Sequence, residues 1–302
     1  MVLSPCRHQA LPLHPPTVGL VPVVINRTPA PKGKGLDPAP PLLSIIQHNC
    51  LGSQNVFLPL FESFKEVTTY SSIVLLQDPP VYKTHLPSFN GPKSFFPYVR
   101  RPCVAAYVYM SFLSNYMVLP RFREEDDVLA LEVSSQEPPF GTDLHCFRSI
   151  DAYSTTVHHQ VHSVQPEALF PDLGFPLLIV GDLNIHNPLS DPRRAVSLRE
   201  ISSSTPYFEK AAEGGFALLN HPGEYTRFPL VGKARPSMTD LAFTNPLLLP
   251  VVKSWEASLP STGSDHIPIT IILTPPSLIQ KPLRLRWADT DWETLTLIIR
   301  DF

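Results

Sequence analysis

The sequence predicts an α/β fold with mixed β-sheets, and three observations support this class. A strand, a helix and a second strand follow one another in residues 42–78, which is the order of a βαβ unit. Residues 95–133 then contain short apolar segments with little helix between them, which indicates an antiparallel meander. Residues 177–180 form a continuous apolar run, typical of a strand that is covered on both faces.

The first 41 residues differ from the rest of the chain. They contain ten of the 36 prolines among the 302 residues, and they show no apolar periodicity. Prolines interrupt every apolar patch, so no signal-peptide core forms, and no run approaches the roughly 20 apolar residues of a membrane helix. We therefore predict a disordered leader at 1–41, a folded domain at 42–275, a tail at 276–302, and no membrane association.

Charge and cysteine content narrow the function classes. Residues 42–275 carry 16 basic and 22 acidic side chains, a net charge of −6. The net charge by itself therefore does not indicate nucleic-acid binding. It suits a site that is built from carboxylates and binds a cation. The four cysteines lie far apart without a CxxC pair, which predicts neither a zinc knuckle nor a disulfide framework and favours a reducing compartment.

The opening unit places polar groups after apolar strands. The first predicted strand ends at His48 and Asn49, and a helix is predicted over residues 56–67 with Asn55 as a possible N-cap. The second strand ends at Gln77 and Asp78. Both ends are polar tips of otherwise apolar segments.

The middle of the chain is predicted to contain strands at 104–110, 116–119, 128–133 and 147–153, the last ending in Tyr153. His158 and His162 could bind zinc together if that segment were helical. No acidic third ligand lies nearby, so a surface loop or helix is the favoured interpretation.

The run at 177–180 ends in Gly181-Asp182-Leu183-Asn184. Asp182 and Asn184 are two residues apart, so on an extended backbone they point the same way. The alternative is an ordinary strand that ends in an Asp/Asn turn. Beyond it we predict a helix at 206–215 and strands at 239–243, 251–257 and 267–273, with polar groups next to the first and last of these strands.

Five motifs in this order resemble the endonuclease/exonuclease/phosphatase superfamily, which has the DNase I-like fold. They cover residues 42–275 and read Asn49, Gln77-Asp78, Gly181-Asp182-Leu183-Asn184, Ser237-Met238-Thr239-Asp240 and Ser264-Asp265-His266. The resemblance implies a four-layered α/β sandwich of two mixed β-sheets flanked by helices. It also implies that the polar tips converge at one end.

Within that superfamily, the chain is most similar to the endonuclease domain of non-LTR (LINE-like) retroelements. Residues 281–292 resemble the linker that leads from such domains toward a reverse transcriptase, so we expect a fragment or separate gene that derives from a retroelement. The chain departs from the pattern at Asp78, where the family has a metal-binding Glu. It also has Leu51 where some relatives carry a second acidic group.

The resemblance implies a role for each residue. Asn49, Asp78 and Asp265 would hold Mg²⁺, with Mn²⁺ as an alternative. Asp182, held by Asn184, would handle the proton of the water or the leaving group, and His266, oriented by Asp240, would contact the phosphate. Tyr153 is a candidate phosphate contact, with core packing as its alternative.

Three functions are compatible with these residues. The first is a Mg²⁺-dependent phosphodiesterase that nicks DNA as a monomer, inside the cell and, for a retroelement endonuclease, in the nucleus. The second is a phosphatase for a small phosphoester, which the acidic balance favours. The third is a catalytically decayed, non-enzymatic remnant, which Asp78 favours.

Overall fold

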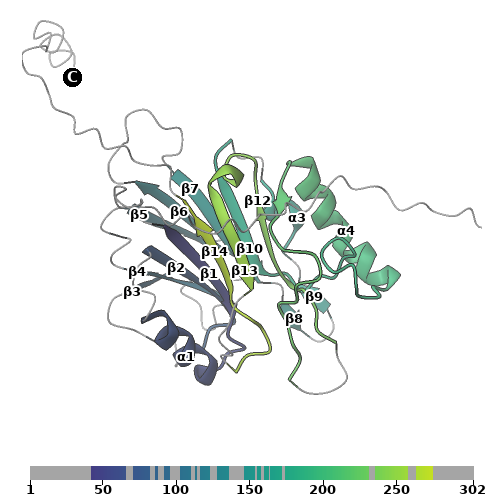
Figure 1. Cartoon of the computed structure of the whole chain (residues 1–302), viewed down its shortest axis with the longest axis horizontal. Coiled ribbons are helices and arrows are strands. Elements are labelled where there is room, and N and C mark those ends of the chain that lie inside the picture. Colours follow the sequence, from purple (N-terminus) through teal and green to yellow (C-terminus); the bar gives the residue numbers. More distant parts are fainter. Residues whose placement is uncertain are drawn as a thin grey trace, which may run out of the picture.

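The structure is a computed structural model that describes residues 42–274, except 66–70, 82–85, 88–91, 96–102, 110–112, 114–115, 123–127, 136–145, 154, 158–159, 163, 172–173, 231–234 and 258–262. The predicted leader and the predicted tail lie outside the described residues. Figure 1 shows the element order.

The first sheet contains six strands in the order β13-β14-β1-β2-β4-β3. β1 and β2 are parallel, while the other neighbours in this sheet are antiparallel, so the sheet is mixed. Its strands are β1 (Leu43–Asn49), β2 (Ser71–Gln77), β3 (Pro92–Phe95), β4 (Val104–Tyr109), β13 (Val252–Ala257) and β14 (Ile269–Leu273).

The second sheet contains six strands in the order β11-β12-β10-β7-β6-β5. Here β7 and β10 form the parallel pair, and the remaining pairs are antiparallel. Its strands are β5 (Tyr116–Phe122), β6 (Val128–Ser135), β7 (Cys146–Tyr153), β10 (Leu177–Asp182), β11 (Ala217–Leu218) and β12 (Asp240–Thr244).

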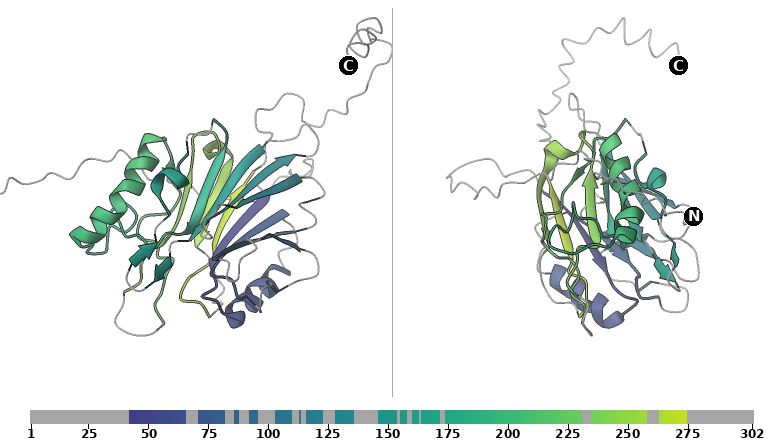
Figure 2. Two further views of the ribbon diagram at one scale, coloured as in Figure 1. Left: turned by 180° about the vertical axis from the view of Figure 1, so that it is seen from behind. Right: turned by 90° about the vertical axis from the view of Figure 1, so that its right-hand side faces the viewer.

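Three apolar clusters hold four layers together. The central cluster lies between the sheets and includes Ile45 and Ile73 from one sheet and Leu131 and Val180 from the other. Helix α1 (Gln54–Lys65) covers the outer face of the first sheet, and α3 (Pro166–Leu169) and α4 (Leu198–Glu213) cover the outer face of the second. Figures 1 and 2 show α1 and α4 on opposite sides of the molecule. The predicted four-layered α/β sandwich is confirmed.

The helix predicted at 206–215 is confirmed for residues 206–213, and a glycine, Gly214, caps its end, but its predicted start was wrong. In the structure α4 begins at Leu198, and Pro206 lies inside it. Ser197 caps the helix, since its side chain accepts a hydrogen bond from the Glu200 amide at 3.3 Å while the Glu200 carboxylate accepts one from the Ser197 amide at 2.8 Å. This reciprocal capping box is the start signal that the prediction missed, and it outweighs the usual preference of proline for a first turn.

Smaller differences concern element ends and a hairpin. α1 begins at Gln54, two residues before its predicted start, and its predicted last residues, 66 and 67, lie outside the described residues. A 3-10 turn, η1 (Leu249–Val251), precedes β13. The segment with His162 is a strand, β9 (Gln160–His162), which pairs with β8 (Thr155–Val157). The helical spacing that a zinc pair would need is therefore absent there; His158 lies outside the described residues. Within the described part of the chain, no helix has the length and apolarity to cross a membrane.

Candidate active site

The polar tips of the parallel strands meet at one end of the two sheets. Asn49 pairs with Gln77 across β1 and β2, and Asp182 pairs with Tyr153 on one side and with Asp240 on the other. Because each parallel pair ends at the same edge of its sheet, these side chains gather where the two sheets face one another. The register of the strands therefore builds the site.

The backbone just after three of these strands adopts a left-handed conformation. Leu51, Asp78 and Asn184, which follow β1, β2 and β10, have φ values of 51°, 42° and 49°, and they are the described non-glycine residues with positive φ. Such values are uncommon outside glycine and tend to persist at functional sites. Gly181 is needed for another reason: a Cβ there would lie 1.9 Å from the carbonyl oxygen of Ala152 on β7.

Asp182, Asp240 and His266 form a buried cluster. His266 Nδ1 lies 2.8 Å from Asp240 Oδ2, and His266 Nε2 lies 3.8 Å from Asp182 Oδ2. One ligand atom from each of the three lies within 4.8 Å of the others. His266 thus stands between two carboxylates, oriented by one and facing the other.

Burial and mutual charge set the protonation of this cluster. Burial opposes the charge of His266, but the charge of Asp240 and their hydrogen bond outweigh it and raise the pKa of His266 to about 9. Burial also opposes ionisation of Asp240, but the charge and hydrogen bond of His266 hold its pKa below the usual value. Burial and the charge of Asp240 raise the pKa of Asp182 to about 6. His266 is thus protonated near neutral pH, while Asp182 can exchange a proton there.

Two asparagines hold Asp182. Asn49 Nδ2 donates to Asp182 Oδ2 at 2.9 Å, and Asn184 donates from its amide to Oδ1 at 3.2 Å and from its side chain to Oδ2 at 3.3 Å. Ser264 joins the last motif to the first, since its hydroxyl donates to the Asn49 carbonyl at 2.9 Å and accepts from the His266 amide at 3.0 Å.

A buried hydrogen-bond chain behind the cluster connects the two sheets. Gln47 donates to Asp240 Oδ1 at 3.0 Å and also to Gln77, and Gln77 donates in turn to Asp151. All four residues are at most 1 % exposed. Burial raises the pKa of Asp151 well above its usual value, although the hydrogen bond from Gln77 opposes this. The chain fixes Asp240 from the side opposite His266.

Asp78 and Tyr153 lie beside one another. Burial and the charges of Asp78 and Asp182 raise the pKa of the half-buried Tyr153, which also hydrogen-bonds to Asn49. The Asp78 carboxylate lies next to Gly52, within 3.7 Å of where a Cβ would be, and the Gly52 amide donates to the Asp78 carbonyl at 2.7 Å. Tyr153 also packs against the central apolar cluster. The residue therefore has both a polar neighbourhood, as a phosphate contact would need, and the core packing that was the alternative.

Asp265 has one bound oxygen and one without a hydrogen bond. Arg227 Nε donates to Asp265 Oδ2 at 2.9 Å. Oδ1 is buried without a hydrogen-bond partner among the described residues, 3.6 Å from His266 Nε2. The structure therefore brings together all eight residues selected from the sequence: Asn49, Asp78, Tyr153, Asp182, Asn184, Asp240, Asp265 and His266.

The donor set suits a hard cation. Asp265 Oδ1 is a buried oxygen without a hydrogen bond among the described residues, and Asn49, Asp78 and Asp182 add amide and carboxylate oxygens to the same site. Mg²⁺ and Mn²⁺ prefer such oxygen ligands. His266 is less suited to bind a cation, because the raised pKa keeps its ring protonated and Asp240 occupies Nδ1.

The sequence analysis did not select Gln47, Asp151 or Arg227. Gln47 carried a signal, because it lies two residues before Asn49 and so points to the same face of β1. Asp151 was visible as a carboxylate in a predicted strand. Nothing in the local sequence of Arg227 indicates its contact with Asp265, because 38 residues separate them.

Comparisons with known proteins identify the fold. No family model matches the sequence, and no curated protein matches it. Among solved structures, the endonuclease domain of TRAS1, a telomere-specific non-LTR retrotransposon, is similar with a TM-score of 0.57 and 15% identity, covering 77% of this chain and 99% of that one. The AP endonuclease LMAP from Leishmania major is similar with a TM-score of 0.61 and 16% identity, covering 85% of this chain and 93% of that one. The chain has the DNase I-like fold, as its motifs predicted.

Proposed function

We propose that this protein is a Mg²⁺-dependent phosphodiesterase that nicks DNA. The observation that carries the proposal is the buried cluster in which His266 Nδ1 lies 2.8 Å from Asp240 and Nε2 faces Asp182 at 3.8 Å. Phosphodiester cleavage needs a group that handles the proton of the attacking water and a positive group that faces the developing charge on the phosphate. Asp182 and His266 supply the two.

Each residue in the cluster has a distinct task. Asp182 accepts a proton from water, since its pKa of about 6 makes it ionised at neutral pH and still basic enough to act. His266 donates its Nε2 hydrogen to a phosphate oxygen, and Asp240 keeps the ring protonated and oriented. Asn49 and Asn184 hold the Asp182 carboxylate.

Asn49, Asp78 and Asp265 are the residues that would hold the divalent cation. When bound, such an ion polarises the phosphoryl oxygen and stabilises the developing charge. Asp265 is kept in place by Arg227, which neutralises one of its oxygens. Tyr153, next to Asn49 and Asp78, has a hydroxyl that can donate to the phosphate.

The proposal that DNA is the substrate is supported by the similar structures, which are described as an endonuclease domain of a retrotransposon and an AP endonuclease. The motif order and the tail resembling the linker to a reverse transcriptase favour an origin in a non-LTR retroelement. We propose that the enzyme acts as a monomer in the nucleus, where its substrate is.

Nicking of supercoiled plasmid tests the proposal. Wild-type protein with Mg²⁺ should convert supercoiled plasmid to the open circle, and chelation of Mg²⁺ or the substitution Asp182→Ala should abolish the conversion. Glu256→Gln is a matched control, because this residue lies on the edge strand β13 and has no part in the site. Equal conversion by wild type and Asp182→Ala would refute the function.

A second candidate is a phosphatase for small phosphoesters, favoured by the net charge of −6 over residues 42–275. The same cluster could act on such a substrate. Release of phosphate from an inositol phosphate, without nicking of plasmid, would replace the first proposal with this one.

A further inference from the structure

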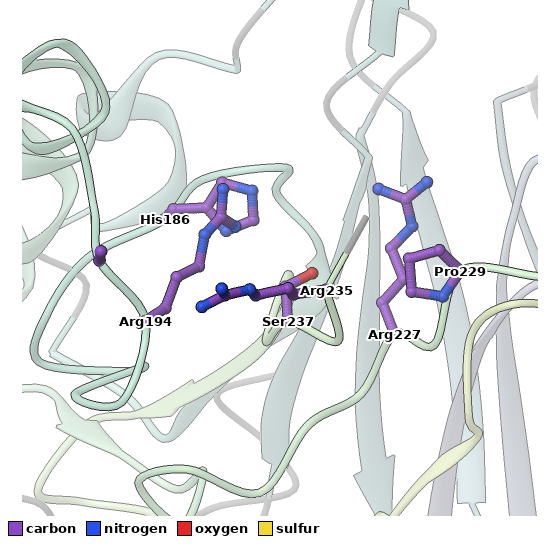
Figure 3. A pocket seen from close by; sticks show the side chains of 7 residues that line it. His186, Arg194, Arg227, Pro229, Arg235 and Ser237 are labelled. Atoms are coloured by element: carbon purple, nitrogen blue, oxygen red, sulfur yellow. The ribbon is translucent and has the colours of Figure 1, made fainter. Parts of the chain in front are cut away.

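A cavity of about 450 Å³ lies beside the candidate active site and is rich in cationic side chains. None of its seven described lining residues is acidic. Figure 3 shows Arg194 and Arg235 extending toward the same space near His186, with Arg227 rising next to Pro229. The lining residues are His186, Arg194, Ala195, Arg227, Pro229, Arg235 and Ser237.

Two of the three arginines are held in place by carboxylates. Arg227 Nε donates to Asp265 at 2.9 Å, and Arg194 Nη2 lies 2.7 Å from Glu200 Oε1. Arg235 pairs with no carboxylate within 4.0 Å among the described residues, so its charge is not neutralised there. The cavity therefore has two fixed guanidinium groups and one available for a ligand.

The fourth cationic candidate, His186, is neutral. Burial and the charges of Arg194 and Arg227 lower the pKa of His186 to about 4. Its Nδ1 is buried and has no hydrogen-bond partner in the described part of the chain. A neutral ring with an unpaired nitrogen can donate a hydrogen bond to a ligand oxygen at neutral pH.

The cavity is connected to the catalytic cluster through Arg227. The backbone of Arg227 pairs with Ser237, which lines the cavity, and with His266, which belongs to the cluster. Its side chain binds Asp265, and the Phe228 amide donates to the Asp265 carbonyl at 2.6 Å. The cavity and the catalytic cluster thus share the Arg227 segment.

We propose that this cavity is an anion subsite that binds a phosphate of the nucleic-acid strand adjacent to the phosphate that is cut. This inference rests on the proposed function, which supplies the strand. Guanidinium groups match phosphate oxygens in pairs of hydrogen bonds, and no carboxylate among the described residues pairs with Arg235. Because the domain is acidic overall, a local cationic cavity is where a polyanion gains contact energy.

Salt dependence of DNA binding tests the subsite directly. The full chain with Asp182→Asn, which binds without cutting, is titrated with a fluorescent duplex in Mg²⁺ at several KCl concentrations. Adding Arg235→Gln should weaken binding by roughly tenfold and lower the slope of log K against log salt by about 0.9, the value for one lost phosphate contact. Lys253→Gln, an exposed charge on β13, removes the same charge far from the cavity and should leave the slope unchanged.

A titration with inorganic phosphate separates the strand from a free anion. In the same protein, the NMR signals of the Arg235 and Arg194 Nε–H groups should shift with phosphate, and duplex DNA should move them at far lower concentration. An unchanged salt slope in Arg235→Gln, with nicking by wild type intact, would overturn the subsite and leave the proposed function standing. A reduced slope in a protein that never nicks would support the subsite and refute the catalytic proposal. Shifts with phosphate but none with DNA would overturn the strand assignment.

Discussion

The cluster of Asp182, Asp240 and His266 and the pair of carboxylates Asp78 and Asp265 are built in different ways. Asp182, Asp240 and His266 are at most 4 % exposed, lie on strands or directly before one, and contact one another. Asp78 is half-buried and follows its strand on a left-handed backbone, and Asp265 is anchored by Arg227 from a loop. The cluster is specified by sheet register and burial, the pair by local turns.

This difference indicates that the two groups of residues have different tasks, proton transfer in one and cation binding in the other. Buried charges that hold one another keep shifted pKa values, which proton transfer requires. Asp78 is only half-buried, so its carboxylate can adjust to a cation, and Asp265 has a second oxygen that Arg227 does not bind. We therefore expect Asp182, Asp240 and His266 to control the maximal rate, and Asp78 and Asp265 to control how much Mg²⁺ is needed.

The largest effect is expected for Asp182→Asn. Loss of the base should reduce the nicking rate at saturating Mg²⁺ by about 10³-fold or more. Burial already disfavours the charge of Asp182, so the melting temperature should stay the same or rise. Calorimetry beside single-turnover nicking checks both parts. A large loss of stability would mean that Asp182 is structural.

Asp240→Asn should have the next largest effect, about 10²-fold on the rate. Burial lowers the pKa of His266, and without Asp240 only the charges of Asp182 and Asp265 still raise it, so this pKa should fall from its wild-type value of about 9. NMR titration of the His266 ring in metal-free protein measures this directly. Asp191→Asn, another buried carboxylate outside the cluster, serves as the control and should leave the His266 titration unchanged.

The same pair predicts how stability depends on pH. Because the folded pKa of His266 lies above the unfolded value of 6.5, its contribution is full below pH 6.5 and is lost as the pH rises through about 9. The loss should be about 3 kcal/mol in wild type and smaller in Asp240→Asn. Urea unfolding at pH 6 and pH 9.5 gives the comparison. Equal losses in the two proteins would remove Asp240 as the cause.

The smallest effect is expected for deletion of residues 1–41. Ten prolines and no periodic apolar face leave little to bury, so the melting temperature should change by less than about 2 °C. Differential scanning calorimetry of the two chains measures this. A drop of many degrees would show that the leader docks on the domain.

The sequence was informative where a two-residue spacing brings side chains together. Asp182 and Asn184 were selected on this spacing and they do share contacts, but β10 ends at Asp182 and Asn184 has a left-handed backbone, so a turn joins them and not strand periodicity. The two-residue spacing would also have selected Gln47, which lies two residues before Asn49 on β1. A glutamine within an apolar strand was not selected as a site residue. Motif order predicted the sandwich itself.

What the sequence could not supply depends on tertiary contact. Arg227 becomes part of the site only because its segment pairs between Ser237 and His266. His186 and Arg194 lie in the loop between β10 and α4, whereas Arg235 lies before β12, and no spacing rule connects the three residues. The start of α4 was missed for a local reason, since the predicted helix began at Pro206 and the Ser197 capping box lies nine residues earlier.

The Mg²⁺ dependence of nicking by Asp78 variants tests the central claim most directly. If Asp78 holds the cation, Asp78→Ala should abolish nicking at low Mg²⁺ and recover part of the rate at high Mg²⁺, raising the half-saturating concentration at least tenfold. Asp78→Glu should nick at least as well as wild type, and it would restore activity if the shorter carboxylate has impaired the enzyme. Wild-type Mg²⁺ dependence in Asp78→Ala would contradict the division of the site into a proton-handling half and a cation-binding half.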